Sequence, residues 1–376
     1  MPKLAVGSNQ FSMTEKFTEI ITSSVDGRLD RQCLDILGRL DRDHSVISVV
    51  YFFAAGSDEV CLLNGHILQS TTASALRDCP LVSYVPQRPM GGRLVAEILY
   101  IKGNPEVEMR EDYVVLRSGG CEEILTQGVR FPSSGDIGGQ SSKVFDRIGN
   151  ILERESFAVS DIVRQWNYID HITSVSEGLQ NYQLFNDARS DFYETTEWSN
   201  GYPAATGIGC DSGGLMVMVY AVKGFGGANL PLDNPLQVPA HRYSGRVLAS
   251  GKEAVRTTPK FERGRLLGDV VFVSGTAAIK GEDSEFSEDT RVQALGAIDV
   301  VEHLVAPSNI SPDCSAFRFG YLRVYVRRPQ DLEPVREMFI SHFKDTPIHF
   351  LQADICRPEL LLELEGVGRA LPFLKP

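Results

Sequence analysis

The sequence predicts an α+β fold with two tandem β-α-β-α-β-β domains, each a mixed sheet with helices packed on one face. Strand-like and helix-like patterns alternate along both halves of the chain. The order of elements in the second half also repeats the order in the first half, which indicates an internal duplication. A length of 376 residues, with 43% hydrophobic and 23% charged residues, is typical of a globular protein of roughly two domains.

The C-terminal half shows the repeated order most clearly. Its two helical segments carry apolar residues at helical spacing, and its strands are β-branched runs bounded by Gly, Pro and Asp. We predict strands at 268–279, 316–326, 348–356 and 360–368, with helices at 287–304 and 331–343.

The N-terminal half offers the same order, and a cysteine, Cys210 or Cys356, ends the penultimate strand of each copy. Strands and hairpins are expected to dominate the region before it, from residue 46 onward. The repeated elements are predicted as strands at 126–137, 158–169, 202–210 and 214–223, with helices at 141–154 and 178–193.

Composition places the domain boundaries. The first residues are polar and mixed, and the run GFGGANLPLDNPLQVP is too rich in Gly, Pro and Asn for a regular element. We therefore expect an N-terminal extension at 1–45, a first domain at 46–223, a linker at 224–239 and a catalytic second domain at 240–376.

The charge and the hydropathy pattern argue against several function classes. A net charge of −12 repels polyanions, so no nucleic-acid partner is expected. The longest apolar run, residues 215–222, is far shorter than the ~20 residues that span a bilayer, and the N-terminus shows no secretory signal. We expect a cytoplasmic protein without a membrane partner.

The cysteines and glycine motifs do not predict a metal or nucleotide site. Seven cysteines are scattered without a C-x-x-C pair or a histidine at zinc spacing, so they are interpreted as reduced thiols. His171, His241 and His349 lack the spacing of a triad. No phosphate-binding glycine motif joins a strand to a helix. Neither a metal nor a cofactor is expected.

Three strings of the C-terminal half, FVSGTAAI, LRVYVRR and LLELEGVG, resemble the Rid (YjgF-type) imine deaminases, whose fold is chorismate-mutase-like. Those deaminases hold the substrate carboxylate with the arginine of a Pro-Ala-Arg motif. This chain has Pro203-Ala204-Ala205 in one copy and His349-Phe350 near the matching place in the other. The deaminase interpretation therefore lacks its key residue.

A second set of strings, NYQLFNDARSDFY, WNYI, YPAATGIGC and LQADICRPELLLELEG, resembles the chorismatase family over most of residues 110–376. The resemblance implies cleavage of chorismate to pyruvate and 3-hydroxybenzoate without a cofactor. Hydrolysis to a 3,4-dihydroxycyclohexa-1,5-diene carboxylate, or formation of 4-hydroxybenzoate, stays open as an alternative. A non-catalytic Rid-like module that binds a metabolite is the alternative of another class.

Glu363 is the first candidate catalytic residue. Strand alternation puts Glu363 and Glu365 on one face, and from the bare sequence both could face solvent. The resemblance places Glu363 at the position of the family's catalytic acid and leaves Glu365 structural. A carboxylic acid with a raised pKa could protonate the methylene of the enolpyruvyl ether and then stabilise the resulting cation.

Cys356 is the second candidate, seven residues before Glu363. Its ordinary interpretation is a small buried apolar side chain. The resemblance implies that a cysteine here accompanies 3-hydroxybenzoate formation and an alanine accompanies hydrolysis. Gly275 and Ala277 are expected to influence product choice through their size, and Ala277, larger than glycine, keeps the hydrolytic product open.

Chorismate carries two carboxylates, so at least two cationic groups must hold it inside an acidic protein. Each candidate arginine alone could be an ordinary surface residue, and the case for them is that they flank the junction between the repeats. The candidate substrate-binding residues are Arg323, Tyr325, Arg189, Arg242, Tyr243 and Arg246. Two copies fused in one chain favour a monomer.

Overall fold

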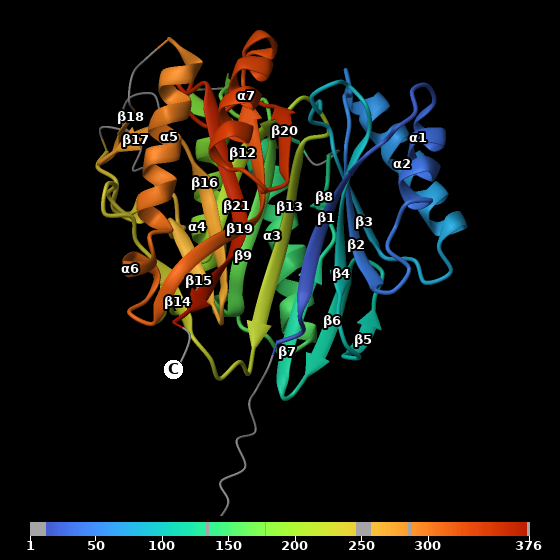
Figure 1. Cartoon of the computed structure of the whole chain (residues 1–376), viewed down its shortest axis with the longest axis horizontal. Helices are drawn as coiled ribbons and strands as arrows, with labels where there is room; N and C mark the ends of the chain where they lie inside the picture. Colours follow the sequence, from blue (N-terminus) through green and yellow to red (C-terminus); the bar gives the residue numbers. More distant parts are fainter. Residues whose placement is uncertain (1–12, 133–134, 177, 246–256, 285–287, 374–376) are drawn as a thin grey trace, which may run out of the picture.

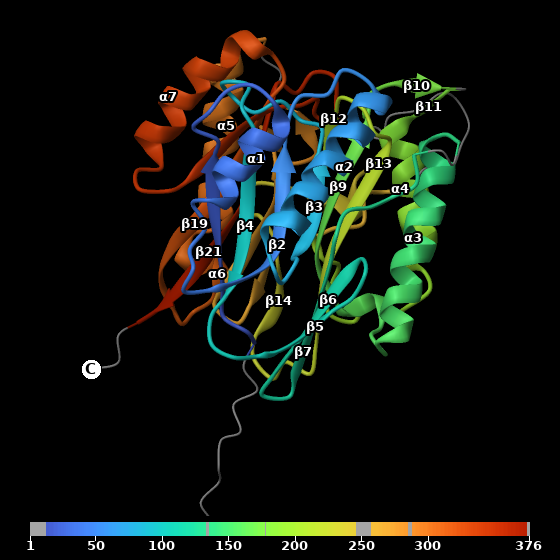
Figure 2. The same ribbon diagram turned by 90° about the vertical axis from the view of Figure 1, so that its right-hand side faces the viewer.

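The computed structural model describes residues 13–132, 135–176, 178–245, 257–284 and 288–373. Its strands form three main sheets of four, seven and six strands. The sheets face one another at the centre of the molecule, and the helices lie on the outside (Figure 1, Figure 2). Each sheet with its two long helices is a unit, and we number the units in chain order.

The first unit occupies residues 16–101. Its sheet has the order β1-β4-β2-β3, in which only β2 and β3 run parallel. The elements are β1 (Lys16–Thr22), α1 (Leu29–Leu37), β2 (Ser45–Phe52), α2 (Asp58–Ala75), β3 (Leu81–Val85) and β4 (Val95–Ile101).

The second unit occupies residues 106–223 and has the order β12-β9-β13-β7-β6-β5, with β8 paired to β13. A small ladder of β10 and β11 precedes its second helix. The elements are β5 (Glu106–Met109), β6 (Tyr113–Ser118), β7 (Cys121–Thr126), β8 (Val129–Arg130), α3 (Ile137–Arg154), the 3-10 turn η1 (Val159–Asp161), β9 (Ile162–Asp170), β10 (Val175–Ser176), β11 (Leu179–Gln180), α4 (Asn181–Tyr193), β12 (Ala204–Cys210) and β13 (Leu215–Lys223).

The third unit occupies residues 229–372 and has the order β14-β15-β16-β21-β19-β20. The elements are β14 (Asn229–Leu232), η2 (Ala240–Arg242), β15 (Gly264–Leu267), β16 (Val270–Thr276), β17 (Ile279–Lys280), β18 (Asp283–Ser284), α5 (Thr290–Leu304), α6 (Pro307–Ile310), β19 (Cys314–Val326), η3 (Pro329–Asp331), α7 (Leu332–His342), β20 (Ile348–Gln352) and β21 (Leu362–Pro372).

All three sheets share one core topology. In each main sheet, the last strand before the first long helix pairs with the last strand of the unit, and that last strand pairs with the strand between the two helices. The strand between the helices then runs parallel to the strand that follows the second helix. The predicted α+β fold with tandem repeats and helices on one face of mixed sheets is therefore confirmed, and the pairing reveals a third copy at residues 16–101.

Apolar alternation explains why each sheet holds its helices. In the third unit, Leu362 and Leu364 of β21 point into the core beneath α5, whose Ala297, Val301 and Leu304 are buried there. Comparable cores lie beneath α3 and α4 and beneath α1 and α2. Each strand thus has one face toward its helices and leaves its other face for the centre of the molecule.

The inner faces of the three sheets pack together. One buried cluster joins Phe52 of the first unit, Tyr168 of the second and Tyr325 of the third. A second cluster joins Ile47, Val163 and Leu267 in the same way. Polar residues on these inner faces are consequently buried between units and must find partners there.

The structure differs from the expected elements at several places. Of the strand expected at 126–137, only β8 and the last residue of β7 are extended, and α3 already begins at Ile137. Helix α2 lies where strands were expected. Its buried face combines Cys61 and Leu68 with Gly65 and Thr72, while Leu62 and Leu63 are exposed, so apolar residues mark this face only in part. Strand β14 lies within the expected linker. It is an edge strand of its sheet, where a proline such as Pro231 is tolerated.

The predicted ranges of the domains stay a prediction. The strand pairing establishes that β1 and α1, which lie within residues 1–45, form part of the first sheet unit. All seven cysteines are free thiols. Among the described residues, no helix is long and apolar enough to cross a membrane.

Candidate active site

A narrow cavity of about 70 Å³ lies at the junction of the second and third units. The second unit contributes residues of α4 and β12, and the third unit contributes residues of β16, β21 and the segment before β15. Six of the residues predicted from the sequence line this cavity: Arg189, Tyr243, Gly275, Ala277, Cys356 and Glu363.

Glu363 is buried, with 4% of its surface exposed. It stands on β21 opposite Tyr325 of β19, on the strand face that points away from the helices. Burial raises the pKa of Glu363 to about 8, and the negative charge of Glu365 acts in the same direction, against Arg164 and Arg263. The side chain is therefore mostly protonated at neutral pH, as a general acid must be.

Gly275 makes room for this acid. A Cβ built on Gly275 would overlap Oε1 of Glu363 and come within 3.1 Å of Cγ2 of Thr206. The Glu363 carboxyl thus lies directly against the backbone of β16. A side chain at position 275 would force the acid out of its present position.

Glu365, two residues further along β21, is also buried but is heavily paired. It accepts hydrogen bonds from Nη2 of Arg164 and Oγ1 of Thr206, from Nη1 of Arg323 at 2.7 Å and from the hydroxyl of Tyr325 at 2.7 Å. Burial raises the pKa of Glu365, but the charges of Arg323 and Arg164 outweigh it, so the pKa is lowered. Glu365 is a carboxylate, in contrast to its neighbour Glu363.

The network around Glu365 joins all three units. Arg323 also donates from Nε to Oε1 of Glu97 on β4 of the first unit, at 2.6 Å. Nδ1 of His349 lies 3.3 Å from the same Glu97 oxygen. Tyr168 of the second unit accepts a bond from Nη1 of Arg323 at 2.9 Å. These buried contacts link residues of all three units in one hydrogen-bonded network.

Three arginines at the cavity form no ion pair within the described residues: Arg189, Arg263 and Arg357. Arg189 donates from Nη2 to Asn186 at 2.6 Å, and its buried Nε has no partner within the same residues. Arg263 donates to the hydroxyl of Tyr243 at 2.5 Å, and its Nε is likewise unpartnered there. These unbalanced positive charges suit a ligand with more than one carboxylate.

Cys356 lines the cavity close to Glu363. Burial raises the pKa of its thiol to about 12, and the charge of Glu363 acts in the same direction. The thiol is therefore protonated at neutral pH, so it can donate or relay a proton but does not act as a thiolate nucleophile. Nε2 of Gln180 on β11 donates to the backbone carbonyl of Cys356 at 3.3 Å and holds this segment in place.

The remaining predicted residues do not line the cavity. The donors and acceptors of Arg323 and Tyr325 are taken up by the network around Glu365, which lies deeper between the units. Arg242 is exposed on the surface. Arg246 lies outside the described residues. The possibility that Glu363 and Glu365 face solvent is excluded by their burial, because a second unit covers that strand face.

Sequence reasoning missed several residues of the cavity. Arg263, Arg357 and Tyr182 line it beside the predicted ones. Arg357 stands directly after Cys356, so the motif that marked the cysteine could have indicated it. Tyr182 lies in the string NYQLFNDARSDFY, seven residues before Arg189 and therefore on the same face of α4. Arg263 precedes β15 without a motif, and only its packing against Tyr243 places it in the site.

The fold and the site together define a class of α+β protein in which repeated sheet-and-helix units enclose a buried acid beside unbalanced arginines. Such a junction can hold an anionic molecule next to a proton donor. Comparison with known proteins is consistent with this class. Residues 99–221 match the family described as "Chorismatase FkbO/Hyg5-like, N-terminal".

Two curated relatives extend the similarity. A 3-hydroxybenzoate synthase of Streptomyces hygroscopicus is 33% identical over 229 residues, 57% of this chain and 65% of the relative. A chorismatase of Streptomyces rapamycinicus is 29% identical over 238 residues, 60% of this chain and 67% of the relative. The alignment with the first of these spans just under two thirds of that relative's length.

A crystal structure of a chorismatase has the same fold. It matches with a TM-score of 0.71 and 22% sequence identity, over 95% of this chain and 99% of the solved chain. The predicted resemblance to the chorismatases is thus confirmed, in sequence over more than half of the chain and in fold over nearly all of it.

Proposed function

We propose that this chain is an enzyme that converts chorismate to pyruvate and 3-hydroxybenzoate. The observation that carries the proposal is Glu363, a buried acid whose pKa of about 8 keeps it protonated at neutral pH. It lies beside arginines that form no ion pair with an acid of the described residues. The names of the similar proteins support the choice of substrate and product.

The arginines would hold the two carboxylates of chorismate. Arg189 reaches the cavity from the second unit, whereas Arg263 and Arg357 reach it from the third. Anchors on both sides of the junction would fix the orientation of the ring and of the enolpyruvyl group. A ligand of this size fills the cavity only when the lining side chains move apart, because the open space is about 70 Å³.

Glu363 would start the reaction by giving its proton to the terminal methylene of the enolpyruvyl group. The ether carbon then becomes an oxocarbenium-like centre, which the Glu363 carboxylate stabilises. The oxygen of the neighbouring ring hydroxyl attacks the ring carbon that bears the ether, and the bond from that carbon to the ether oxygen breaks. Pyruvate leaves with the ether oxygen as its keto oxygen.

The remaining steps restore the acid and form the phenol. The proton of the attacking hydroxyl passes to the Glu363 carboxylate, directly or through the Cys356 thiol. The arene-oxide-like product opens at the carbon that carried the hydroxyl, and its oxygen takes up a proton. The carbon that keeps the oxygen loses its hydrogen as a proton, which gives 3-hydroxybenzoate. All atoms of chorismate appear in the two products, so this route requires no co-reactant.

Hydrolysis is the second outcome at the same site. If water attacks in place of the ring hydroxyl, the products are pyruvate and the dihydroxycyclohexadiene carboxylate. Ala277 lines the cavity, and its size bears on the space left for water. Cys356, larger than alanine, fills space near Glu363, and for this reason we favour the intramolecular route.

The test is incubation of the purified protein with chorismate. Pyruvate is measured by a coupled assay, and the aromatic or diene acid is identified by mass spectrometry. We expect pyruvate release in equal amount to 3-hydroxybenzoate, with no added metal or nucleotide. Glu302→Gln, on the exposed face of α5, is the matched control for Glu363→Gln. If folded protein releases pyruvate only at the uncatalysed rate, the proposed enzymatic function is rejected and a metabolite-binding module is favoured.

Two further proposals concern the setting of the enzyme. We propose a monomer, because three units already pack their inner sheet faces against one another within one chain. Size-exclusion chromatography with light scattering measures the mass directly. We also propose a cytoplasmic location, which fractionation of the producing cells would test.

A further inference from the structure

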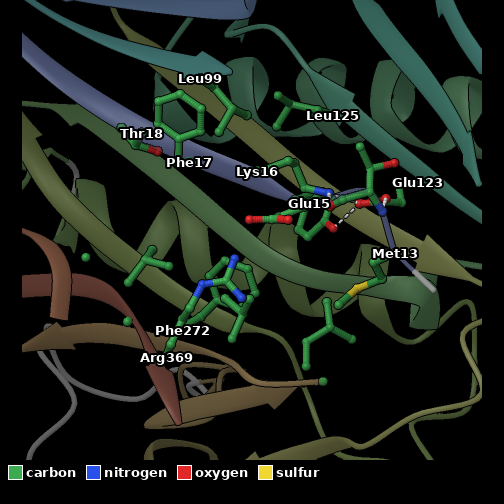
Figure 3. A pocket seen from close by; sticks show the side chains of 18 of the residues that line it. Met13, Glu15, Lys16, Phe17, Thr18, Leu99, Glu123, Leu125, Phe272 and Arg369 are labelled. Carbon is green, nitrogen blue, oxygen red and sulfur yellow. Dashed lines mark hydrogen bonds and ion pairs between the residues drawn. The ribbon is translucent and has the colours of Figure 1, made fainter. Parts of the chain in front are cut away.

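A second, larger cavity lies at the centre of the molecule, between the three sheets, and shares no lining residue with the candidate active site. Its volume is about 990 Å³, at the upper end of the range of roughly 300 to 1,000 Å³ for ligand pockets. Figure 3 shows Phe17, Leu99 and Leu125 on one side and Phe272 and Arg369 on the other.

The walls of this central cavity are mainly apolar. The first unit contributes Phe17 and Leu99, and the second contributes Leu125 and Trp166. The third unit contributes Phe272 and neighbouring valines. Rings and aliphatic chains from three units thus surround one space, which suits the apolar body of a ligand.

Two arginines of the third unit stand side by side at this cavity. Arg318 of β19 and Arg369 of β21 are direct partners in the antiparallel ladder, and both line the cavity. Like charges directly opposite each other destabilise a sheet. A carboxylate placed between the two guanidinium groups would offset this repulsion. Arg369 is paired with Asp269 at 2.5 Å, whereas Arg318 has no ion pair or side-chain hydrogen bond within the described part of the chain.

The other charged residues of the lining are balanced by their own partners. Lys16 is paired with Glu123, as the dashed line in Figure 3 marks. Glu15 is paired with Lys102 at 2.8 Å. Arg318 and Arg369 together therefore carry one positive charge that no acidic residue of the described lining balances. A single carboxylate would balance it.

The alternation of β21 separates this cavity from the active site. Glu363 faces the active site, Glu365 is enclosed in the buried network, and Val367 and Arg369 line the central cavity. These four residues share one strand face at two-residue steps. The ion pairs around Glu365 thus form the barrier between the two cavities.

We propose that the central cavity binds an amphipathic carboxylic acid, with its apolar chain or ring between the three sheets and its carboxylate between Arg318 and Arg369. This site is distinct from the one that would bind chorismate. The proposal does not depend on turnover, because binding is measured without chorismate.

Dodecanoate is a suitable probe, and the protein carries a suitable reporter. Of its two tryptophans, Trp166 lines the central cavity, whereas Trp198 packs on Tyr193 and Tyr202 at another place. In Trp198→Phe, all tryptophan fluorescence comes from Trp166. We expect a saturable change of this fluorescence on titration with dodecanoate, and a dissociation constant from calorimetry that agrees with it.

Charge variants test the role of the two arginines. We expect Arg318→Gln/Arg369→Gln to weaken dodecanoate binding tenfold or more, because charge-assisted hydrogen bonds to a carboxylate are lost. The neutral dodecanol should bind the unchanged protein at least tenfold more weakly than dodecanoate. Arg28→Gln/Arg336→Gln is the matched control, since both arginines are exposed and neither lines the cavity.

Three results would overturn the proposal. The first is the absence of saturable dodecanoate binding to the folded protein. The second is equal binding by the arginine double variant and the control double variant, which would leave only an apolar cavity. The third is loss of dodecanoate binding in Glu363→Gln, which would show that dodecanoate binds in the candidate active site and not in the central cavity. Failure of chorismate turnover alone leaves these measurements unaffected.

Discussion

The pKa of Glu363 can be tested through its neighbour Glu365. Glu363 must be protonated to act, so kcat/KM should be high below its pKa of about 8 and fall as the pH rises through that value. The negative charge of Glu365 is one cause of the raised pKa. Glu365→Gln removes this charge and should move the fall in kcat/KM to lower pH.

The size of the change follows from the strand geometry. Two residues on one face of a strand are about 7 Å apart, since each residue advances roughly 3.3 Å. Two charges at that distance interact by about 2 kcal/mol at an effective dielectric constant of about 20. At 1.36 kcal/mol for each pH unit, the fall should move by about 1 to 2 pH units. Release of Arg164 from Glu365 acts in the same direction.

The assay is pyruvate release from chorismate at low substrate concentration between about pH 5 and pH 10. Circular dichroism and the thermal midpoint Tm show whether each variant is folded across this range. Glu97→Gln is the matched control, because it removes a buried carboxylate from the same network without lying next to Glu363. We expect the fall in kcat/KM to stay near pH 8 in this control.

An unchanged position of the fall in folded Glu365→Gln would refute the reasoning. It would mean that the charge of Glu365 is screened from Glu363 by Arg164 and Arg323. An equal displacement in Glu97→Gln would instead assign the effect to a general loosening of the network. Either result would separate the pKa of Glu363 from its neighbour on the strand.

Three other substitutions test the site itself. Glu363→Gln keeps the shape of the side chain but removes its ionisable proton, so turnover should fall by about 100-fold or more at nearly constant chorismate affinity. Near-normal turnover would exclude Glu363 as the catalytic acid. Cys356→Ala should lower the ratio of 3-hydroxybenzoate to diene acid by about tenfold, which corresponds to a change of ~1.4 kcal/mol in the difference between the barriers of the two routes. An unchanged product ratio would show that the thiol only fills space. Gly275→Ala places a methyl group against Glu363, so kcat should fall by at least about tenfold with little change in Tm, whereas full activity would show that the acid tolerates displacement.

The alternation of apolar and charged residues was enough to predict much of the third unit. Leu362 and Leu364 were expected on one face of a strand, with Glu363 and Glu365 on the other, and the structure has them so. The helices α5 and α7 were expected near their observed positions for the same reason. Periodicity is a local property, so it can be read from a single chain.

Other features depend on contacts between distant residues. Helix α2 escaped prediction because its buried positions include Gly65 and Thr72, and only the sheet beneath it makes these positions interior. The copy at residues 16–101 became visible through strand pairing, because no motif quoted from the other copies recurs there. Pattern alone does not reveal pairing between strands that are far apart in the sequence.

The sequence by itself determined that Glu363 and Glu365 share a face, and the family resemblance implied that Glu363 is the catalytic acid. Only the tertiary structure decided that this face is buried and that the two carboxylates differ in charge. Arg164 and Arg323, from two different units, hold Glu365 ionised, while burial and the neighbouring charge keep Glu363 protonated. A pKa depends on the charges and the solvent around a group in space, and the chain brings those together only when it folds.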